Sequence, residues 1–168
     1  MRRDILVGIP ILLVAVIIQT AILGRINLLN GQADLLLMIL AAWSLQEQVH
    51  SAWVWGAAAG LLVALISGAA WYIYPVSYLM VVALGRLLAR RIWQAPLLAM
   101  FMVVFTGTLV MLMFTYSVRT IFEVSLGFNL SFVRIILPSI LINMLLAIPV
   151  HSIIRSLATL LHPSEGMA

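Results

Sequence analysis

Charged residues are almost absent from long stretches of this chain and are concentrated in the gaps between them. Two segments, Ala52–Tyr74 and Trp93–Val118, contain no Asp, Glu, Lys or Arg. At about 1.5 Å of helical rise per residue, each is long enough to cross a hydrocarbon core about 30 Å thick. Of 168 residues, only nine are basic and five acidic, and 65% are hydrophobic. The sequence therefore predicts an all-α integral membrane protein.

The apolar stretches predict a bundle of six transmembrane helices in one domain, residues 1–168. The second stretch is the weakest, because the apolar run Leu35–Leu45 reaches only about half the bilayer. This helix either starts earlier, near Leu28, or is short and shielded by its neighbours. If it only dips into the bilayer, the spans number five. Pro75 is expected to end the third helix. The predicted helices are residues 5–23, 28–45, 52–74, 76–89, 93–118 and 135–154.

The distribution of arginine predicts the orientation, because cationic residues tend to stay on the cytoplasmic side. With the N-terminus inside, three arginines flank the outer ends and six flank the inner ends. Both termini are then cytoplasmic. The six predicted cytoplasmic arginines are Arg2, Arg3, Arg86, Arg90, Arg91 and Arg155.

Composition and motifs argue against several functions. The net charge is +4, but the nine arginines form no basic stripe of the kind that binds nucleic acid. There is no Cys, and His50, His151 and His162 lack the spacing of a metal site. Phosphate-binding loops and nucleophile motifs are missing. We therefore expect no catalytic residues, no metal, no cofactor and no enzymatic activity.

Small residues recur every four positions along the predicted third helix. Residues four apart lie nearly on one line of a helix, so this pattern makes a groove that another backbone can approach closely. The groove is either an internal seam of the bundle or a docking face for a partner helix. Its members are Ala52, Gly56, Gly60, Ala64 and Gly68.

Two polar residues are candidates for specific contacts inside the apolar segments. Asp34 stands where the second helix begins, as a cap for its free amides or as a polar contact. Asn143 lies in the last helix between Pro138 and Pro149. A buried amide in lipid is expected to bond to another helix, in this chain or in a partner.

The connection before the last helix has a different pattern. Apolar side chains alternate with small or polar ones, a period typical of extended backbone, although a helical spacing also fits. We expect this extracytoplasmic segment to lie on the membrane surface or to add to the edge of a partner's sheet. The alternating residues are Val124, Leu126, Phe128, Leu130 and Phe132.

Five stretches spread over nearly the whole chain share a characteristic order and spacing: residues 18–21, 32–40, 56–62, 78–91 and 137–149. Their order, their spacing and the length of the chain resemble the MreD family of bacterial rod-shape proteins. The chain departs from the pattern of that family in two places. Ala33 stands where Pro is common in the family, and the acid that often follows the glycines of the third helix is absent.

The resemblance implies a scaffold in the bacterial inner membrane that helps organise peptidoglycan synthesis and cell shape. Proteins of that family bind MreC, and through it RodA, a class B penicillin-binding protein and MreB. Their fold is similar to that of energy-coupling factor substrate-binding subunits. The groove of the third helix, or the face of the last helix that carries Asn143, is expected to hold the MreC helix. The alternative is the substrate-binding subunit of a vitamin-type transporter.

Overall fold

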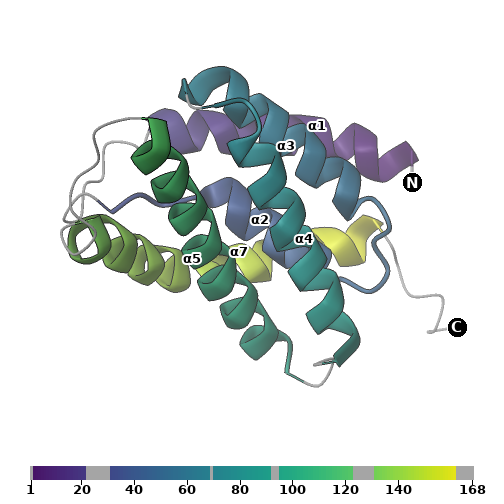
Figure 1. Ribbon diagram of the computed structural model, residues 1–168. Helices are drawn as coiled ribbons and strands as arrows, with labels where there is room; N and C mark the ends of the chain where they lie inside the picture. Colours follow the sequence, from purple (N-terminus) through teal and green to yellow (C-terminus); the bar gives the residue numbers. More distant parts are fainter. Residues whose placement is uncertain (1, 22–30, 69, 92–94, 123–130, 162–168) are drawn as a thin grey trace, which may run out of the picture.

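The structure is a computed structural model that describes residues 2–21, 31–68, 70–91, 95–122 and 131–161. Helices form a single bundle, and no β-sheet occurs within those ranges (Figure 1). The helices are α1 (Arg2–Ala21), α2 (Leu35–Ser44), α3 (Ala52–Ser67), α4 (Ile73–Arg91), α5 (Pro96–Phe122), the π-helical turn η2 (Phe132–Ile136) and α7 (Leu137–Leu161).

Three helical segments are long and apolar enough to cross a membrane, judged by length and composition. They are Ile73–Arg91, Pro96–Ile121 and Phe132–Leu161. Three further apolar helices are shorter: Leu6–Ala21, Leu35–Ser44 and Ala52–Ser67. The long helices support a membrane protein with an all-helical fold. The six-span topology stays a prediction.

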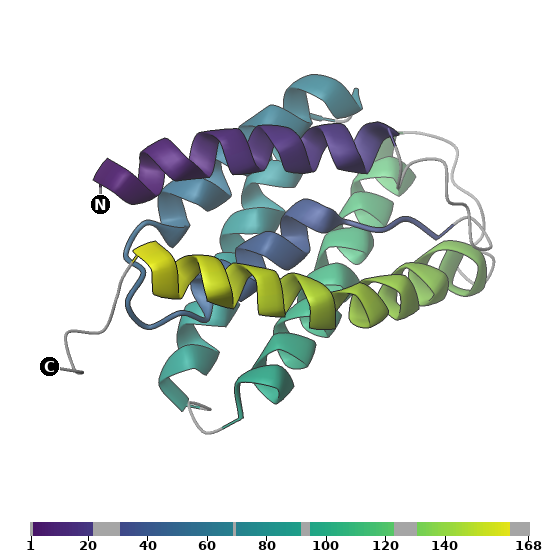
Figure 2. The ribbon, with the colours of Figure 1, turned by 180° about the vertical axis from the view of Figure 1, so that it is seen from behind.

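Helix α2 lies at the centre of the bundle, where α1, α3, α4, α5 and α7 all contact it (Figures 1 and 2). Every residue from Leu36 to Ser44 is buried. Such a helix needs partners on all sides, since it is apolar all round. The predicted range 28–45 is wrong at its start, because the backbone at Asp34 is extended (φ −112°, ψ 91°). The expectation of a short, shielded helix is confirmed.

The boundary between α3 and α4 corrects a second prediction. Helix α3 ends at Ser67 instead of Tyr74, because Gly68 adopts a left-handed conformation (φ 65°) that closes the helix. Pro75 does not stop a helix. It lies in the first turn of α4, where a missing N–H costs nothing.

The remaining helices also run differently from their predicted ranges. Helix α1 begins at Arg2 instead of 5, and α4 ends at Arg91 instead of 89. Helix α5 begins at Pro96, a residue suited to a first turn, and reaches Phe122 instead of 118. Helix α7 continues to Leu161, past the predicted end at 154. Near the end of α5 the Thr120 hydroxyl donates a hydrogen bond to the Tyr116 carbonyl one turn earlier.

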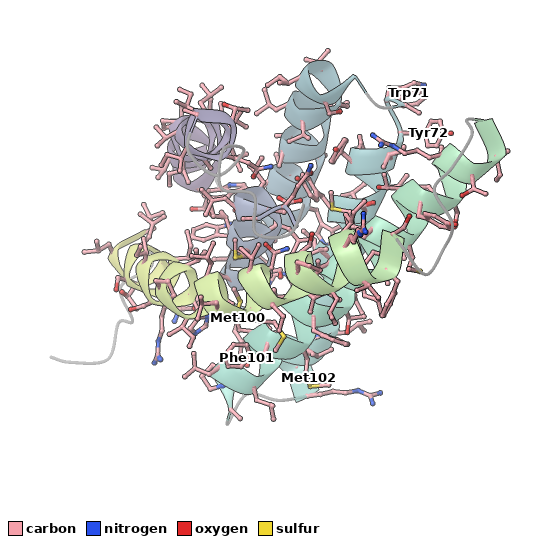
Figure 3. The ribbon with its side chains drawn as sticks, turned by 90° about the vertical axis from the view of Figure 1, so that its left-hand side faces the viewer. Trp71, Tyr72, Met100, Phe101 and Met102 are labelled. Carbon is pink, nitrogen blue, oxygen red and sulfur yellow. The ribbon has the colours of Figure 1, made fainter. Side chains whose placement is uncertain are left out.

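The start of α1 and the ends of α4 and α7 lie toward the same side of the bundle (Figure 1). At the α3–α4 connection Trp71 and Tyr72 lie well away from Met100–Met102 of α5 (Figure 3). Trp71 is 73% exposed, as expected for an aromatic residue at a membrane interface. Which side faces the cytoplasm stays a prediction.

Candidate functional site

Five polar side chains surround the first turn of α2 inside an otherwise apolar bundle. They come from α1, from the residue before α2, and from α4, α5 and α7, so they connect parts of the chain that are distant in sequence. We call this cluster the polar hub, and it consists of Gln19, Asp34, Tyr78, Thr108 and Asn143.

Asp34 is the centre of the polar hub and caps α2. Its Oδ1 accepts a hydrogen bond from the Leu37 amide at 2.9 Å. The Tyr78 hydroxyl, which is fully buried, lies 3.0 Å from each carboxyl oxygen of Asp34 and donates to them. The predicted cap is confirmed, and Asp34 also makes a polar contact with α4. Both roles foreseen for this residue are therefore fulfilled within the chain.

Gln19 completes the cap from α1. Its Oε1 accepts from the amides of Leu35 at 3.0 Å and Leu36 at 3.3 Å. The Met38 amide bonds to the Asp34 carbonyl in the regular helical manner. The first amides of a helix have no partner within it. Gln19 and Asp34 supply these partners, so α2 can begin in the apolar interior at little cost.

Asn143 joins α7 to both α2 and α5. Its Oδ1 accepts from the Asp34 amide at 2.8 Å, and its Nδ2 donates to Thr108 Oγ1 at 3.0 Å. Both Asn143 and Thr108 are almost fully buried. The expected interhelical bond of Asn143 is thus made inside this chain and not to another subunit.

Replacing Asn143 with Ala should destabilise the fold without preventing insertion. The Asp34 amide and the Thr108 hydroxyl would each lose a buried partner, which costs about 1 to 3 kcal/mol in total. Reversible unfolding of the purified protein in mixed micelles measures this loss. Thr108→Val is the matched partner variant, and additive effects of the two substitutions would contradict the direct bond between them.

The backbone leading into α2 is fixed to the start of α7. Ser139 Oγ accepts from the Gln32 amide at 2.9 Å and donates to the Ile135 carbonyl at 2.7 Å. A side chain at Gly31 would collide with Pro138, which is buried. Pro138 is therefore an internal packing residue. Pro149 differs, since it is exposed and α7 continues through it.

The small residues of α3 form an internal seam against α4 over part of their length. A Cβ atom at Gly60 would collide with the backbone of Pro75, and one at Gly56 would lie 3.0 Å from Val82 Cγ2. Docking of a partner helix at these two glycines is excluded, because α4 already occupies the space. Ala52 is buried, Ala64 is partly buried and Gly68 is exposed at the end of the line.

A second buried polar cluster ties α1 to the start of α3. The Ser51 hydroxyl donates to Asp4 Oδ2 at 3.3 Å, and Trp55 Nε1 donates to the Asp4 carbonyl at 3.2 Å. Trp43 Nε1 donates to Ser51 Oγ, and its ring stacks on Trp55 at 4.4 Å. A side chain at Gly8 would collide with Trp55. This cluster positions α1 along the bundle.

The other predicted site residues are not part of the polar hub. Arg86 donates to the Gln46 carbonyl just beyond the end of α2, at 3.1 Å. Arg90 and Arg91 lie in the last turn of α4, where positive charge is favourable. Arg155 lies exposed on α7. Of the alternating segment only Phe132 is described, at the start of η2; Val124, Leu126, Phe128 and Leu130 lie outside the described residues.

Sequence reasoning missed three members of the polar hub: Gln19, Tyr78 and Thr108. Each stands inside a long and mostly apolar run, and a polar side chain in such a run is the signal that could have found them. A lone polar side chain in a lipid-buried helix must find a partner on another helix. What the pattern could not give is which of these residues meet, since they are up to 109 positions apart, as Asp34 and Asn143 are.

The polar hub can hold helices together, but it lacks the parts of a catalytic centre. Its one carboxylate is engaged by Leu37 and Tyr78, and none of its five side chains is a nucleophile paired with a base. Within the described residues no three His, Cys, Asp or Glu side chains gather into a metal site. The geometry therefore favours a structural lock.

Fold and site together define a helical membrane protein whose central short helix is held by a buried polar cluster. Comparisons with protein-family profiles, with curated proteins and with solved structures returned no match.

Proposed function

We propose that this protein is a non-enzymatic scaffold of the bacterial cell-elongation machinery. It lies in the inner membrane as a multi-pass protein, binds MreC, and through MreC helps organise RodA, its class B penicillin-binding partner and MreB during peptidoglycan synthesis. The partners are taken from the family resemblance of the sequence. The protein works by holding other polypeptides and requires no cofactor.

One observation supports a scaffold above the other functions. The five side chains of the polar hub are engaged in hydrogen bonds around α2, and this network holds the helices in the core of the bundle rigidly together. A bundle fixed in this way can present an outer surface of constant shape. Preorganised surfaces lose less entropy when a partner binds.

The surface that suits a partner helix is an apolar groove between α1 and α7. It has a volume of about 390 Å³, and α2 forms its floor through Leu35 and Ile39. Val14 of α1 and Ile153 of α7 line its sides and are 53% and 66% exposed. In lipid, van der Waals contact between such a groove and another helix stabilises their association. This groove, and not the row of small residues on α3, is the proposed contact with MreC.

Filling this groove should abolish partner binding without unfolding the protein. Val14→Trp and Ile153→Trp place a large ring in the groove from exposed positions, so the core is not disturbed. We expect at least a tenfold loss of MreC in co-purification from native membranes. Leu65→Trp, at an 84% exposed position of α3, is the matched control. If both groove variants retained MreC at the level of this control, the proposed contact would be wrong.

The transporter alternative has one feature in its favour, a cavity between α1, α3 and α4. Gln19, Thr20, Ser67 and Tyr74 bring polar groups to this cavity, whose volume is about 220 Å³. Pockets for small ligands usually measure about 300 to 1,000 Å³, so it is small for a vitamin. Thermal unfolding in the presence of a vitamin panel separates the two functions, because a bound nutrient raises the melting temperature.

A further inference from the structure

A second cavity lies at the end of the bundle where α4 and α7 finish. Its volume is about 240 Å³, enough for several water molecules or a small charged group. The turn after α2, the end of α4, the start of α5 and one face of α7 enclose it. Polar residues line much of it, including Gln46, Glu47, His151 and Arg155.

His151 is the unusual residue of this cavity. Its side chain is only 4% exposed, and neither Nδ1 nor Nε2 has a hydrogen-bond partner in the described part of the chain. A neutral imidazole carries one donor and one acceptor, and leaving either unpaired in a buried position is costly. Buried polar groups of this kind call for an explanation, and a bound ligand is one of them.

The charges around His151 favour an anion. Arg155 lies one turn further along α7, on the same face of the helix, and also lines the cavity. Helix α5 begins here with Pro96 and Ala99 at the wall, so the positive end of its dipole lies beside the site. Glu47 adds a negative charge at the exposed rim, which can attract an ammonium group.

We propose that this cavity binds a phosphate group, with His151 and Arg155 as its ligands and the positive end of the α5 dipole beside them. An amine next to the phosphate would face Glu47, so phosphoethanolamine fits the arrangement of charges. The phosphate belongs either to the headgroup of a membrane phospholipid or to a soluble compound. The site is independent of the polar hub and of the groove proposed for MreC, and it makes the protein a phosphate-binding protein as well as a scaffold.

The test is thermal unfolding of the delipidated full-length protein in detergent with four probes. Dioleoyl phosphatidylethanolamine, phosphoethanolamine and inorganic phosphate carry the phosphate, whereas dioleoylglycerol has the same acyl chains without it. We expect the first probe to raise the melting temperature and dioleoylglycerol to leave it unchanged. A shift with the soluble probes as well would identify a site for free phosphate, and a shift with the lipid alone would identify a headgroup site.

Two variants connect such a shift to this cavity. Arg155→Gln should weaken binding about tenfold or more, since hydrogen bonds to charged groups are among the strongest. His151→Leu should lose the shift but unfold at the same or a higher temperature without ligand, because it removes an unpaired buried group. Arg91→Gln, an exposed arginine on the same side of the bundle, is the control.

The proposal is wrong if no phosphate probe raises the melting temperature of the wild-type protein. It is equally wrong if Arg155→Gln and His151→Leu respond to phosphatidylethanolamine as strongly as Arg91→Gln does. Because Arg155 is exposed, its variant should fold even if His151→Leu does not. Failure of this test would leave the MreC co-purification result unaffected.

Discussion

Replacing Asp34 with Ala should destabilise this protein more than any other single polar substitution. The change removes the cap on the Leu37 amide and leaves the buried Tyr78 hydroxyl without its acceptor. A lost cap costs about 1 kcal/mol and an unpaired buried group about 1 to 3 kcal/mol, so we expect a loss of about 2 to 4 kcal/mol. Reversible unfolding in mixed micelles measures the loss.

Two further variants separate the roles of Asp34. Asp34→Asn keeps an oxygen for the cap and should retain most of the stability. Tyr78→Phe removes the hydroxyl but not the cap. In a double-mutant cycle, Asp34→Ala and Tyr78→Phe should show coupling of at least about 0.5 kcal/mol, as expected for residues in direct contact. Independent effects would mean that the contact between Asp34 and Tyr78 does not contribute to stability.

Replacing Gly60 with Leu should prevent correct folding of α3 onto α4. Even a Cβ atom at this position collides with the Pro75 backbone, and backbone cannot move aside as a flexible side chain can. Overpacking ordinarily costs about 1 to 3 kcal/mol, so we expect about 3 kcal/mol or more for Leu and a smaller loss for Gly60→Ala. Monodispersity and the unfolding transition of the purified variants measure these losses.

The control for this substitution is Val54→Leu, which adds apolar volume at a 40% exposed position of the same helix and should have little effect. The result also bears on partner binding. If Gly60→Leu were as stable as Val54→Leu and lost only its binding to MreC, the row of small residues on α3 would be an intermolecular surface. We expect instead that stability and MreC binding are lost together.

Much of the secondary structure could be predicted from local sequence, because a backbone in lipid must form its own hydrogen bonds whatever its tertiary contacts are. Apolar runs such as that of α5 must be helical in a bilayer, where the backbone has to bond to itself. Asp34 was predicted to be a cap or a polar contact from its place before an apolar run, and the structure shows the cap. The end of α3 was not predicted correctly. Gly68 and Pro75 could both end this helix, and only the observed conformation at Gly68 distinguishes them.

Only part of the polar hub could be predicted from the sequence. Asp34 and Asn143 stand out because they are rare in apolar segments, but nothing local connects them. Gln19, Tyr78 and Thr108 belong to the same cluster through contacts between helices. His151 was dismissed because it has no metal-ligand spacing, although its burial without a partner is a property of the packed bundle.

The sequence by itself determined that this chain is helical, apolar and suited to a membrane, because these properties follow from composition and from the backbone's need for hydrogen bonds. It also determined where a polar side chain would have to find a partner. The tertiary structure alone decided the partners, the central position of α2 and the internal use of the glycines on α3. Those outcomes depend on the packing of helices far apart in the chain, and residue spacing within one helix does not say which helix will be its neighbour.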